Sequence, residues 1–257
     1  MNKLVKIVLI LLCFILVVYV VHYYHKIRRN QSNEIKKEYA RDASFIKDDL
    51  HDLPLLRFES GKNSNDFFIV IFPGDGGWRD FIDYLSKYFC DHGINTVGIN
   101  TIPYLSDTRK PEEIAKDITR VINNFSEVWN KKKVVLAGYS FGAEILPFVY
   151  NRLDSTTKAK IICLGMIAPS GLADFKVSPV YYYNPKHSKP VMPELSRIKS
   201  VKTLVFCDRD KESICKEIHG PTTFDIVHID HGHLFTGKFP EVSSLITNGL
   251  LNEIRTK

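Results

Sequence analysis

The sequence predicts an α/β fold in which a mostly parallel sheet is flanked by helices. From Leu53 onward, short apolar runs alternate with longer amphipathic segments, and strands that alternate with helices imply a parallel sheet with right-handed crossovers. The apolar runs have no polar face, as is typical of strands covered on both sides. The expected strands are 55–59, 66–72, 94–99, 133–138, 160–167, 201–206 and 224–229.

Helices are expected between these strands. Pro111, Glu112 and Glu113 are typical of a helix start, because proline suits the first turn and acidic side chains favour the positive end of the helix dipole. Segment 169–195 breaks the alternation and is rich in Pro and Tyr, so we expect an excursion over the carboxyl edge of the sheet. The expected helices are 79–90, 111–129, 141–153, 212–219 and 240–254.

The N-terminus predicts an uncleaved transmembrane helix at residues 1–25. Residues 7–21 contain no charge, and the apolar run approaches the ~20 residues that cross a bilayer as a helix. The run ends in bulky aromatic residues, whereas a cleaved signal peptide ends in small ones. Charges on its two sides nearly balance, so they do not set its orientation. Residues 26–52 are strongly charged and predict a polar stalk.

The composition of the whole chain narrows the classes of protein. The 257 residues suffice for one sizeable core. The net charge of +6 fits a solvated exterior, with contact to an anionic membrane as the alternative. The sequence has neither a basic helix nor an aromatic-basic sheet signature, which argues against nucleic-acid binding.

Five cysteines are too few and too scattered for a scaffold built from disulfides. Cys207 and Cys215 flank one loop. They form a bridge in an oxidising compartment or remain two unpaired thiols, and the sequence does not choose between these states.

The sharpest local motif is G-Y-S-F-G at 138–142, which stands between an expected strand and an expected helix. This context is that of the nucleophile elbow of α/β-hydrolases, where glycines allow a sharp turn around the serine. The alternative is a glycine-flanked serine that caps a helix. The motif predicts that residues 53–257 form an α/β-hydrolase domain with Ser140 as its nucleophile.

The base is expected after the last strand, because the serine, the acid and the histidine follow in that order in this fold. We predict His233, since Gly232 permits a tight loop before it, and His231 is the reserve. His228, His231 and His233 have a spacing that could supply zinc ligands. However, His228 lies in an expected strand and no acidic or cysteine partner has a usual zinc spacing. We therefore expect neither a metal nor another cofactor.

The acid is expected in the loop that follows strand 201–206. Asp210 is the first choice, because it lies four residues beyond the end of this strand. Glu212 is the second choice and Asp208 the third. The acid would hold the imidazole in the correct tautomer and stabilise the imidazolium that forms.

An oxyanion hole is expected at the glycine-rich turn P-G-D-G-G-W at 73–78. Hydrolases of this type present one backbone N–H from such a turn and another from the residue after the nucleophile. Here the donors would be Asp75, or Gly76, and Phe141, each worth about 3 kcal/mol in the transition state. A phosphate site is the alternative, but a Walker lysine and a G-x-G-x-x-G pattern are missing.

From about residue 66 to the end, the chain resembles the bacterial VirJ/AcvB virulence-protein family. The resemblance implies an α/β-hydrolase that faces the periplasm from the inner membrane and removes lysine or alanine from aminoacyl-phosphatidylglycerol, or that takes part in type IV secretion. It places the nucleophile at Ser140, the histidine at His233 and the acid within 210–212. The matching segments are GDGGW at 74–78, YLSDTRKPEEIAKD at 104–117, GYSFGAEILPFVYNRL at 138–153 and HGHLFTG at 231–237.

The chain also departs from this family. Cys207 stands where the family usually has glycine, and an aromatic residue is usual near Ser106. The first departure concerns the loop in which the acid is expected, so it affects the choice of the acid. The second concerns the residues that would line the substrate pocket. Longer members carry an additional N-terminal domain, whereas this chain has the expected anchor and stalk.

Three functions follow from these observations. In an aminoacyl-phospholipid esterase, Ser140 would attack the carbonyl and His233 would protonate the departing glycerol hydroxyl. Asp75 and Glu144 are candidates to bind a cationic lysyl group. A carboxylesterase or lipase of other specificity is the near alternative. A periplasmic adaptor without catalytic activity, which reuses the fold to bind type IV secretion components, is the distant one.

Overall fold

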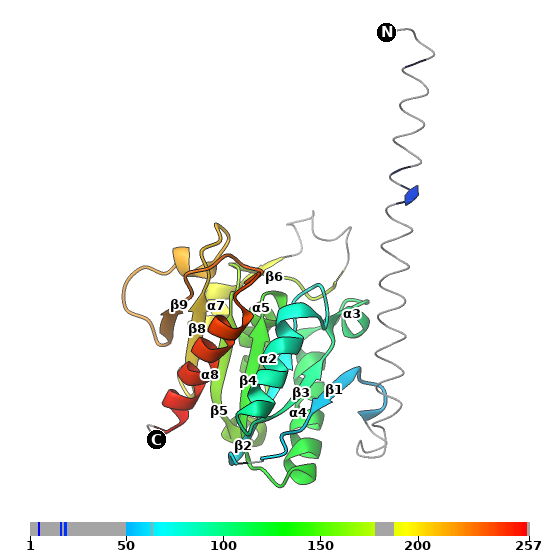
Figure 1. The fold of residues 1–257 in the computed structure, drawn as a ribbon, viewed down its shortest axis with the longest axis vertical. Helices are drawn as coiled ribbons and strands as arrows, with labels where there is room; N and C mark the ends of the chain where they lie inside the picture. The colour runs from blue at the N-terminus through cyan, green and yellow to red at the C-terminus, as the bar shows by residue number, and fades with distance from the viewer. Residues whose placement is uncertain are drawn as a thin grey trace. The chain divides into compact units, whose positions relative to one another are not determined.

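The computed structural model describes residues 50–62, 64–177 and 188–255, together with Val5, Leu16, Val18 and Tyr19 (Figure 1). The chain divides into two compact units, Met1–Ser44 and Phe45–Lys257. In the first unit, the four described residues are helical and exposed. The described part of the chain contains no helix with the length and apolarity that a membrane span needs. The expected anchor, apart from those four residues, and the expected stalk up to residue 49 lie outside the described residues, so both stay predictions.

The second unit is built around a seven-stranded sheet with the order β1-β3-β2-β4-β5-β8-β9. All neighbouring strands are parallel except β1, which runs antiparallel to β3. The predicted mostly parallel sheet is confirmed, and every strand bound lies within one residue of its expected position. The strands are β1 (Leu55–Phe58), β2 (Phe67–Phe72), β3 (Asn95–Ile99), β4 (Lys133–Tyr139), β5 (Ile161–Ile167), β8 (Lys202–Cys207) and β9 (Asp225–His228).

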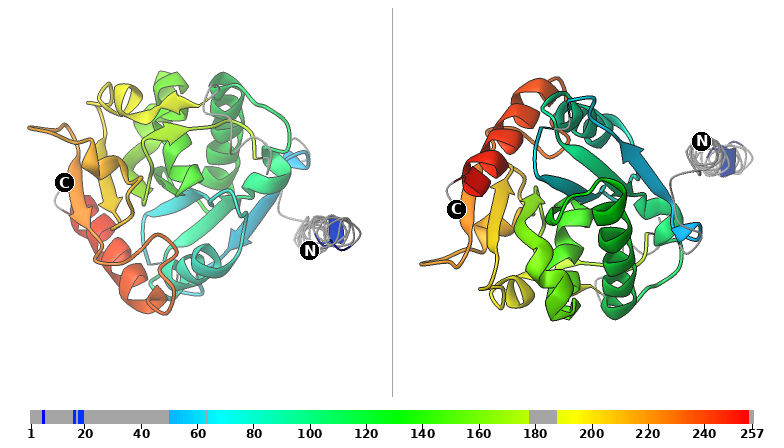
Figure 2. Two further views of the ribbon diagram at one scale, coloured as in Figure 1. Left: turned by 90° about the horizontal axis from the view of Figure 1, so that it is seen from above. Right: turned by 90° about the horizontal axis from the view of Figure 1, so that it is seen from below.

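Helices cover both faces of this sheet (Figure 2). Helices α2 and α8 contribute Leu85 and Ile246 to the same buried cluster as Ile69 of β2, and α4 and α5 pack together elsewhere in the unit. The long helices are α2 (Asp80–Asp91), α4 (Pro111–Val128), α5 (Phe141–Arg152) and α8 (Phe239–Arg255). Short helices that the sequence did not predict are α3 (Thr101–Tyr104), α6 (Ser155–Lys160) and α7 (Val191–Leu195).

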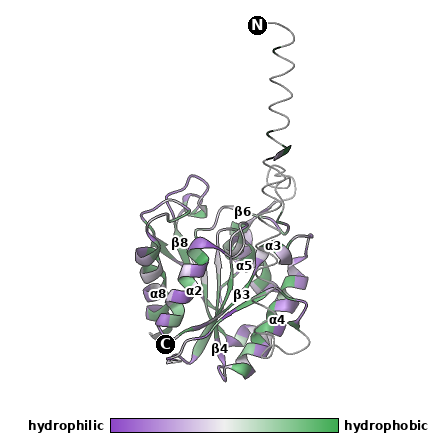
Figure 3. Ribbon diagram, turned by 45° about the vertical axis from the view of Figure 1, so that its right-hand side comes forward, coloured by the Kyte–Doolittle hydropathy of each residue, from purple (hydrophilic) through white to green (hydrophobic). Residues whose placement is uncertain are grey.

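Apolar side chains explain why the central strands lie inside. All residues of β2 and β3 are buried, and Figure 3 shows hydrophobic residues along the strands and polar residues on the outer helices. Helix α4 begins as its sequence predicts, because Pro111 occupies the first turn and the Glu113 carboxylate accepts a hydrogen bond from the Lys110 backbone N–H at 2.8 Å.

The expected helix at 212–219 is wrong. Only a short 3-10 turn forms there, η4 (Ile214–Lys216). The Lys216 and Glu217 N–H groups donate to the carbonyls of Ser213 and Ile214, three residues before them, at 3.1 and 2.9 Å, which is the pattern of a 3-10 turn and not of an α-helix. Within the expected excursion at 169–195, the described residues form α7 and the small antiparallel pair β6 (Leu172–Ala173) and β7 (Lys189–Pro190).

Candidate active site

Ser140 lies on a sharp turn between β4 and α5. Its backbone has φ 52° and ψ −123°, a conformation that is strained for a residue with a side chain. The turn is held from both sides, because the Ser140 N–H donates to the Ile167 carbonyl at 2.8 Å and the Ala143 N–H donates to the Ser140 carbonyl at 2.8 Å. This is the strand-turn-helix context that the motif predicts.

The glycines of the motif are required by close backbone contacts. A Cβ atom at Gly138 would overlap the backbone of Gly142, and a Cβ atom at Gly142 would overlap the carbonyl oxygen of Phe72 at the end of β2. Helix α5 can therefore approach the ends of β2 and β4 only because both positions lack a side chain.

His233 lies against the serine. Its Nε2 atom is 2.7 Å from Ser140 Oγ, and the loop that follows β9 carries it there. Tyr139 holds this loop in place, because its hydroxyl donates to the His233 carbonyl at 2.7 Å and its ring stacks on the imidazole. Tyr139 lies inside the serine motif, but no sequence pattern indicates this role for it.

The structure corrects the expected acid. Asp208, the third choice, contacts the other imidazole nitrogen, with its Oδ2 atom 2.7 Å from His233 Nδ1 and its side chain only 1% exposed. Asp210, the first choice, instead accepts a hydrogen bond from the His233 backbone N–H at 3.4 Å, and Glu212 is exposed.

The reason for this difference is the point at which the strand ends. Strand β8 continues through Cys207, so Asp208 is the first residue beyond it. The Arg209 N–H then donates to the His231 carbonyl at 3.0 Å. This hydrogen bond joins the loop after β8 to the loop after β9, directly beyond the two strands. Asp208 therefore reaches the imidazole directly, and the longer reach expected of Asp210 is not needed.

His231, the reserve base, turns away from the serine. Its Nε2 atom lies 3.1 Å from a carboxylate oxygen of Glu241 in α8. In the described parts of the chain, the group of side chains that could hold a metal ion consists of Asp208, Asp210 and His233. The spacing of the three histidines therefore does not bring them together, and the nitrogens of His233 already contact Ser140 and Asp208.

The surroundings of His233 favour its protonated form. Burial of the ring acts to lower its pKa, but the hydrogen bond and negative charge of Asp208, with the charges of Asp210 and Glu144, outweigh burial. The net effect raises the pKa of His233 above its ordinary value. An imidazole held in this way is a good acceptor for a hydroxyl proton.

The glycine-rich turn after β2 passes beside the serine. A Cβ atom at Gly74 would lie 3.4 Å from Ser140 Cβ, and the Thr101 hydroxyl donates to the Gly74 carbonyl. Phe141 is the first residue of α5, where backbone N–H groups have no partner within the helix. The turn that contains Asp75 therefore passes near Ser140, and Phe141 begins the helix that follows it, but the role of both as oxyanion donors stays a prediction.

Glu144 is a buried carboxylate one helical turn after the nucleophile. Its N–H donates to the Ser140 carbonyl at 3.1 Å, and its Oε1 atom accepts a hydrogen bond from the Ser170 N–H at 3.2 Å. Its residue is 9% exposed, and burial raises its pKa to about 7. The charge of His233 acts to lower this pKa and the charge of Asp75 acts to raise it.

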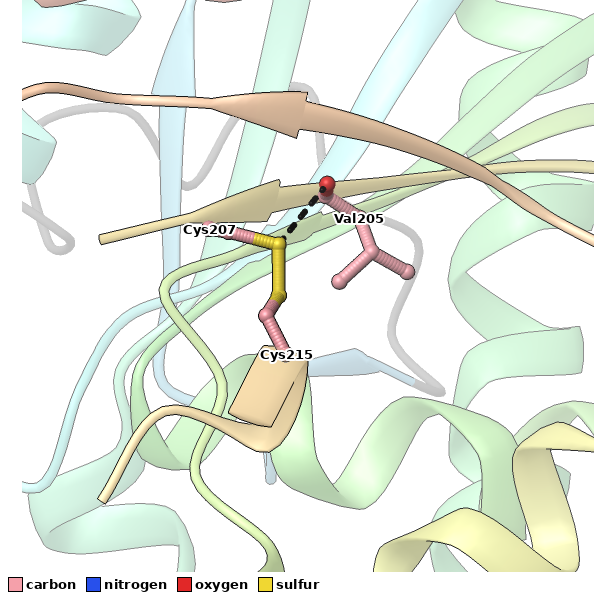
Figure 4. The surroundings of a disulfide bond; sticks show 3 residues. All are labelled: Val205, Cys207 and Cys215. Atoms are coloured by element: carbon pink, nitrogen blue, oxygen red, sulfur yellow. Dashed lines mark hydrogen bonds between the residues drawn. A yellow bond between two sulfur atoms is a disulfide. The ribbon is translucent and has the colours of Figure 1, made fainter. Parts of the chain in front are cut away.

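Cys207 and Cys215 form a disulfide bond, with their Cα atoms 5.9 Å apart (Figure 4). The sequence left open whether these cysteines form a bridge or remain unpaired thiols, and in the structure they form a bridge. The bond joins the last residue of β8 to the turn η4, next to Asp208.

Comparison with protein families identifies the relatives of this chain. The model of the bacterial virulence protein VirJ matches residues 66–256. The chain belongs to the VirJ family. The match includes the serine motif, the glycine-rich turn, both loops that meet at His233 and the helix α8. No curated protein matches the chain.

Solved structures show the α/β-hydrolase fold for this VirJ family member. An α/β serine hydrolase homologue from Coxiella burnetii is 16% identical with a TM-score of 0.51, over 76% of this chain and 90% of that one. Est1E from Butyrivibrio proteoclasticus, solved with ferulic acid, is 13% identical with a TM-score of 0.56, over 78% and 96%. A hydrolase from Oleispira antarctica is 12% identical with a TM-score of 0.53, over 82% and 97%.

Proposed function

We propose that this chain is a serine esterase in which Ser140, His233 and Asp208 form the catalytic triad. The observation that carries the proposal is the continuous path from hydroxyl to imidazole to carboxylate, with 2.7 Å at each of its two steps. The same order of groups activates serine in hydrolases of this fold. The esterases among the structural neighbours are consistent with this proposal.

The reaction would proceed through an acyl-enzyme. His233 Nε2 takes the proton of Ser140 Oγ as this oxygen attacks the ester carbonyl, and the same nitrogen then gives the proton to the departing alcohol. Asp208 accepts the hydrogen bond of Nδ1–H and stabilises the imidazolium. The N–H groups of Phe141 and Asp75 would stabilise the oxyanion. Water then attacks the acyl-enzyme by the same path, which releases the acid.

The substrate that we propose is the aminoacyl ester of a phosphatidylglycerol, lysyl or alanyl. Membership of the VirJ family supports this substrate, and the carboxyl groups of Asp75 and Glu144 are candidate partners for its cationic amino group. The predicted anchor would keep the domain at the inner membrane, where such lipids lie. The disulfide supports a periplasmic position of the domain, because disulfides persist in oxidising compartments.

The experiment compares membrane lipids of cells that produce the wild-type chain, Ser140→Ala or Ser196→Ala. Ser196 is an exposed residue at the end of α7, so its replacement is the matched control. We expect lysyl- or alanyl-phosphatidylglycerol to fall with the wild type and the control, and to remain with Ser140→Ala. Equal lipid levels in all three strains would refute the lipid substrate.

A fluorophosphonate probe separates the lipid question from catalysis. Labelling of the wild type that is lost in Ser140→Ala supports a serine hydrolase, even if the lipids do not change, and points to a carboxylesterase or lipase of other specificity. Absence of labelling in the wild type would refute the esterase and favour an adaptor for type IV secretion components.

A further inference from the structure

The disulfide closes a small ring of chain that contains two carboxylates near the base. Residues 207–215 form this ring, and Figure 4 shows the bond that closes it. Within it, Asp208 contacts the imidazole of His233 and Asp210 contacts the His233 backbone. The covalent link therefore lies between the sheet and the side chains that orient the proposed base.

The ring has little secondary structure of its own to hold it. Residues 209–212 are exposed, and the 3-10 turn η4 begins only at Ile214. The carboxylate of Asp208 has one oxygen against His233, while its other oxygen is buried without a hydrogen-bond partner in the described structure. The position of Asp208 is set by this contact and by its two neighbours, because the Cys207 carbonyl accepts a hydrogen bond from the Ile229 N–H at 2.7 Å and the Arg209 N–H donates to the His231 carbonyl at 3.0 Å.

Contacts on the far side of the ring depend on the same link. The Ile214 N–H donates to the Pro169 carbonyl, and Ser213 pairs with Ser170 in an isolated bridge. Ser170 in turn donates its N–H to Glu144 of helix α5. The disulfide at Cys215 therefore ties the end of β8 to the loop that touches the helix of the nucleophile.

We propose that the Cys207–Cys215 disulfide is a positioning element of the reaction, and that hydrolysis is fast only when this bond is formed. The inference rests on the esterase function proposed above. With the two thiols reduced, residues 208–214 are no longer closed into a ring, so that only the backbone hydrogen bonds of Cys207 and Arg209 and the contact with the imidazole hold Asp208 toward His233. Displacements of about 1 Å in an active site lower turnover by up to about 100-fold.

Formation of the bond needs an electron acceptor, and a small-molecule or protein disulfide would serve. One cysteine thiolate attacks this disulfide and releases one partner thiol. The second cysteine then attacks the mixed disulfide, forms the Cys207–Cys215 bond and releases the other partner thiol. The two thiols of the chain become one disulfide while the partner disulfide becomes two thiols. The chain would therefore become active only after a small-molecule or protein disulfide has oxidised its two thiols.

The test compares the full-length wild type, the double variant Cys207→Ser/Cys215→Ser and Cys90→Ser in the hydrolysis of 4-nitrophenyl butyrate. Cys90 is outside the disulfide. Burial, with the negative charges of Asp91 and Glu59, raises the pKa of its thiol to about 11, so it exchanges poorly. We expect kcat of the double variant to fall about 10- to 100-fold with KM changed less than about threefold, and Cys90→Ser to match the wild type.

The pH profile distinguishes positioning from a general loss of folded protein. The charges of Asp208 and Asp210 act to raise the pKa of His233. If they move away, the acidic limb of kcat/KM shifts to lower pH, whereas a smaller amount of folded enzyme would not move this limb. Unchanged kcat and an unchanged limb in the double variant would overturn the inference and leave the esterase proposal intact.

Reversible reduction covers the case in which the double variant does not fold. Wild-type protein is reduced with dithiothreitol, its circular dichroism is recorded, and it is reoxidised with oxidised glutathione. We expect activity to fall and to return with the disulfide. Full activity in the reduced, folded protein would overturn the inference. A wild type without Ser140-dependent hydrolysis would instead refute the proposed function, on which the inference depends.

Discussion

Asp208 and Asp210 form a matched pair that tests the proposed mechanism directly. Both are carboxylates of one short loop, and both contact His233, but they contact different atoms. Asp208 Oδ2 lies 2.7 Å from the imidazole Nδ1, whereas Asp210 Oδ1 accepts the backbone N–H at 3.4 Å. We expect Asp208→Asn to lose most of the activity and Asp210→Asn to keep most of it.

The magnitude follows from what each contact does in the reaction. Asn at 208 can present its amide N–H to the imidazole, which selects the wrong tautomer, and the imidazolium loses a buried negative partner. Such a replacement lowers kcat by about 10⁴-fold in serine proteases, or about 5.5 kcal/mol. Asp210 is exposed, and its loss removes one hydrogen bond worth about 1 kcal/mol or less. This predicts a decrease in kcat of less than about tenfold.

The assay is steady-state hydrolysis of a 4-nitrophenyl ester by the two variants, with Ser140→Ala as the baseline and circular dichroism as the check of folding. The acidic limb of kcat/KM for the wild type should lie above the ordinary pKa of histidine, because the charge of Asp208 outweighs the burial of the ring. Equal losses in Asp208→Asn and Asp210→Asn would refute the assignment of the acid. A larger loss in Asp210→Asn would reverse it.

Three further predictions concern the residues around the nucleophile. For Glu144, the pKa is about 7 in the folded protein against an ordinary value of 4.5, so the free energy of unfolding should fall by about 3 kcal/mol as pH rises from 4.5 through 7. Glu144→Gln should lack this fall in urea unfolding at pH 5 and pH 8, and an equal pH dependence would contradict the prediction. Gly142→Ala should destabilise the fold by about 2–3 kcal/mol, because its Cβ would overlap the Phe72 carbonyl; an unchanged Tm would exclude this. Tyr139→Phe removes the hydroxyl that holds the His233 carbonyl and should lower kcat several-fold with little change in KM, whereas unchanged kcat would show that this bond does not position the imidazole.

Much of the fold could be predicted because its signals are local. Apolar runs and turn residues gave every strand of the large sheet to within one residue at each end. Pro111 and the acidic residues after it marked the start of α4 correctly. The expected helix at 212–219 failed. The disulfide to Cys207 and the bridge between Ser213 and Ser170 tie this segment to other parts of the chain, and a local pattern does not reveal such links.

Local patterns were enough to predict the parallel α/β sheet, the turn that holds Ser140 and the choice of His233, because strand periodicity, glycine spacing and the order of the groups are read directly along the chain. Contacts between distant segments were needed to show that Asp208 rather than Asp210 meets the imidazole, that Cys207 is bonded to Cys215, and that Tyr139 and Glu144 adjoin the site. The sequence could not choose the acid because the carboxyl groups of Asp208, Asp210 and Glu212 lie in one short loop and are chemically alike. What separates them is the residue at which β8 ends and the direction in which the chain then turns, and distant contacts set both.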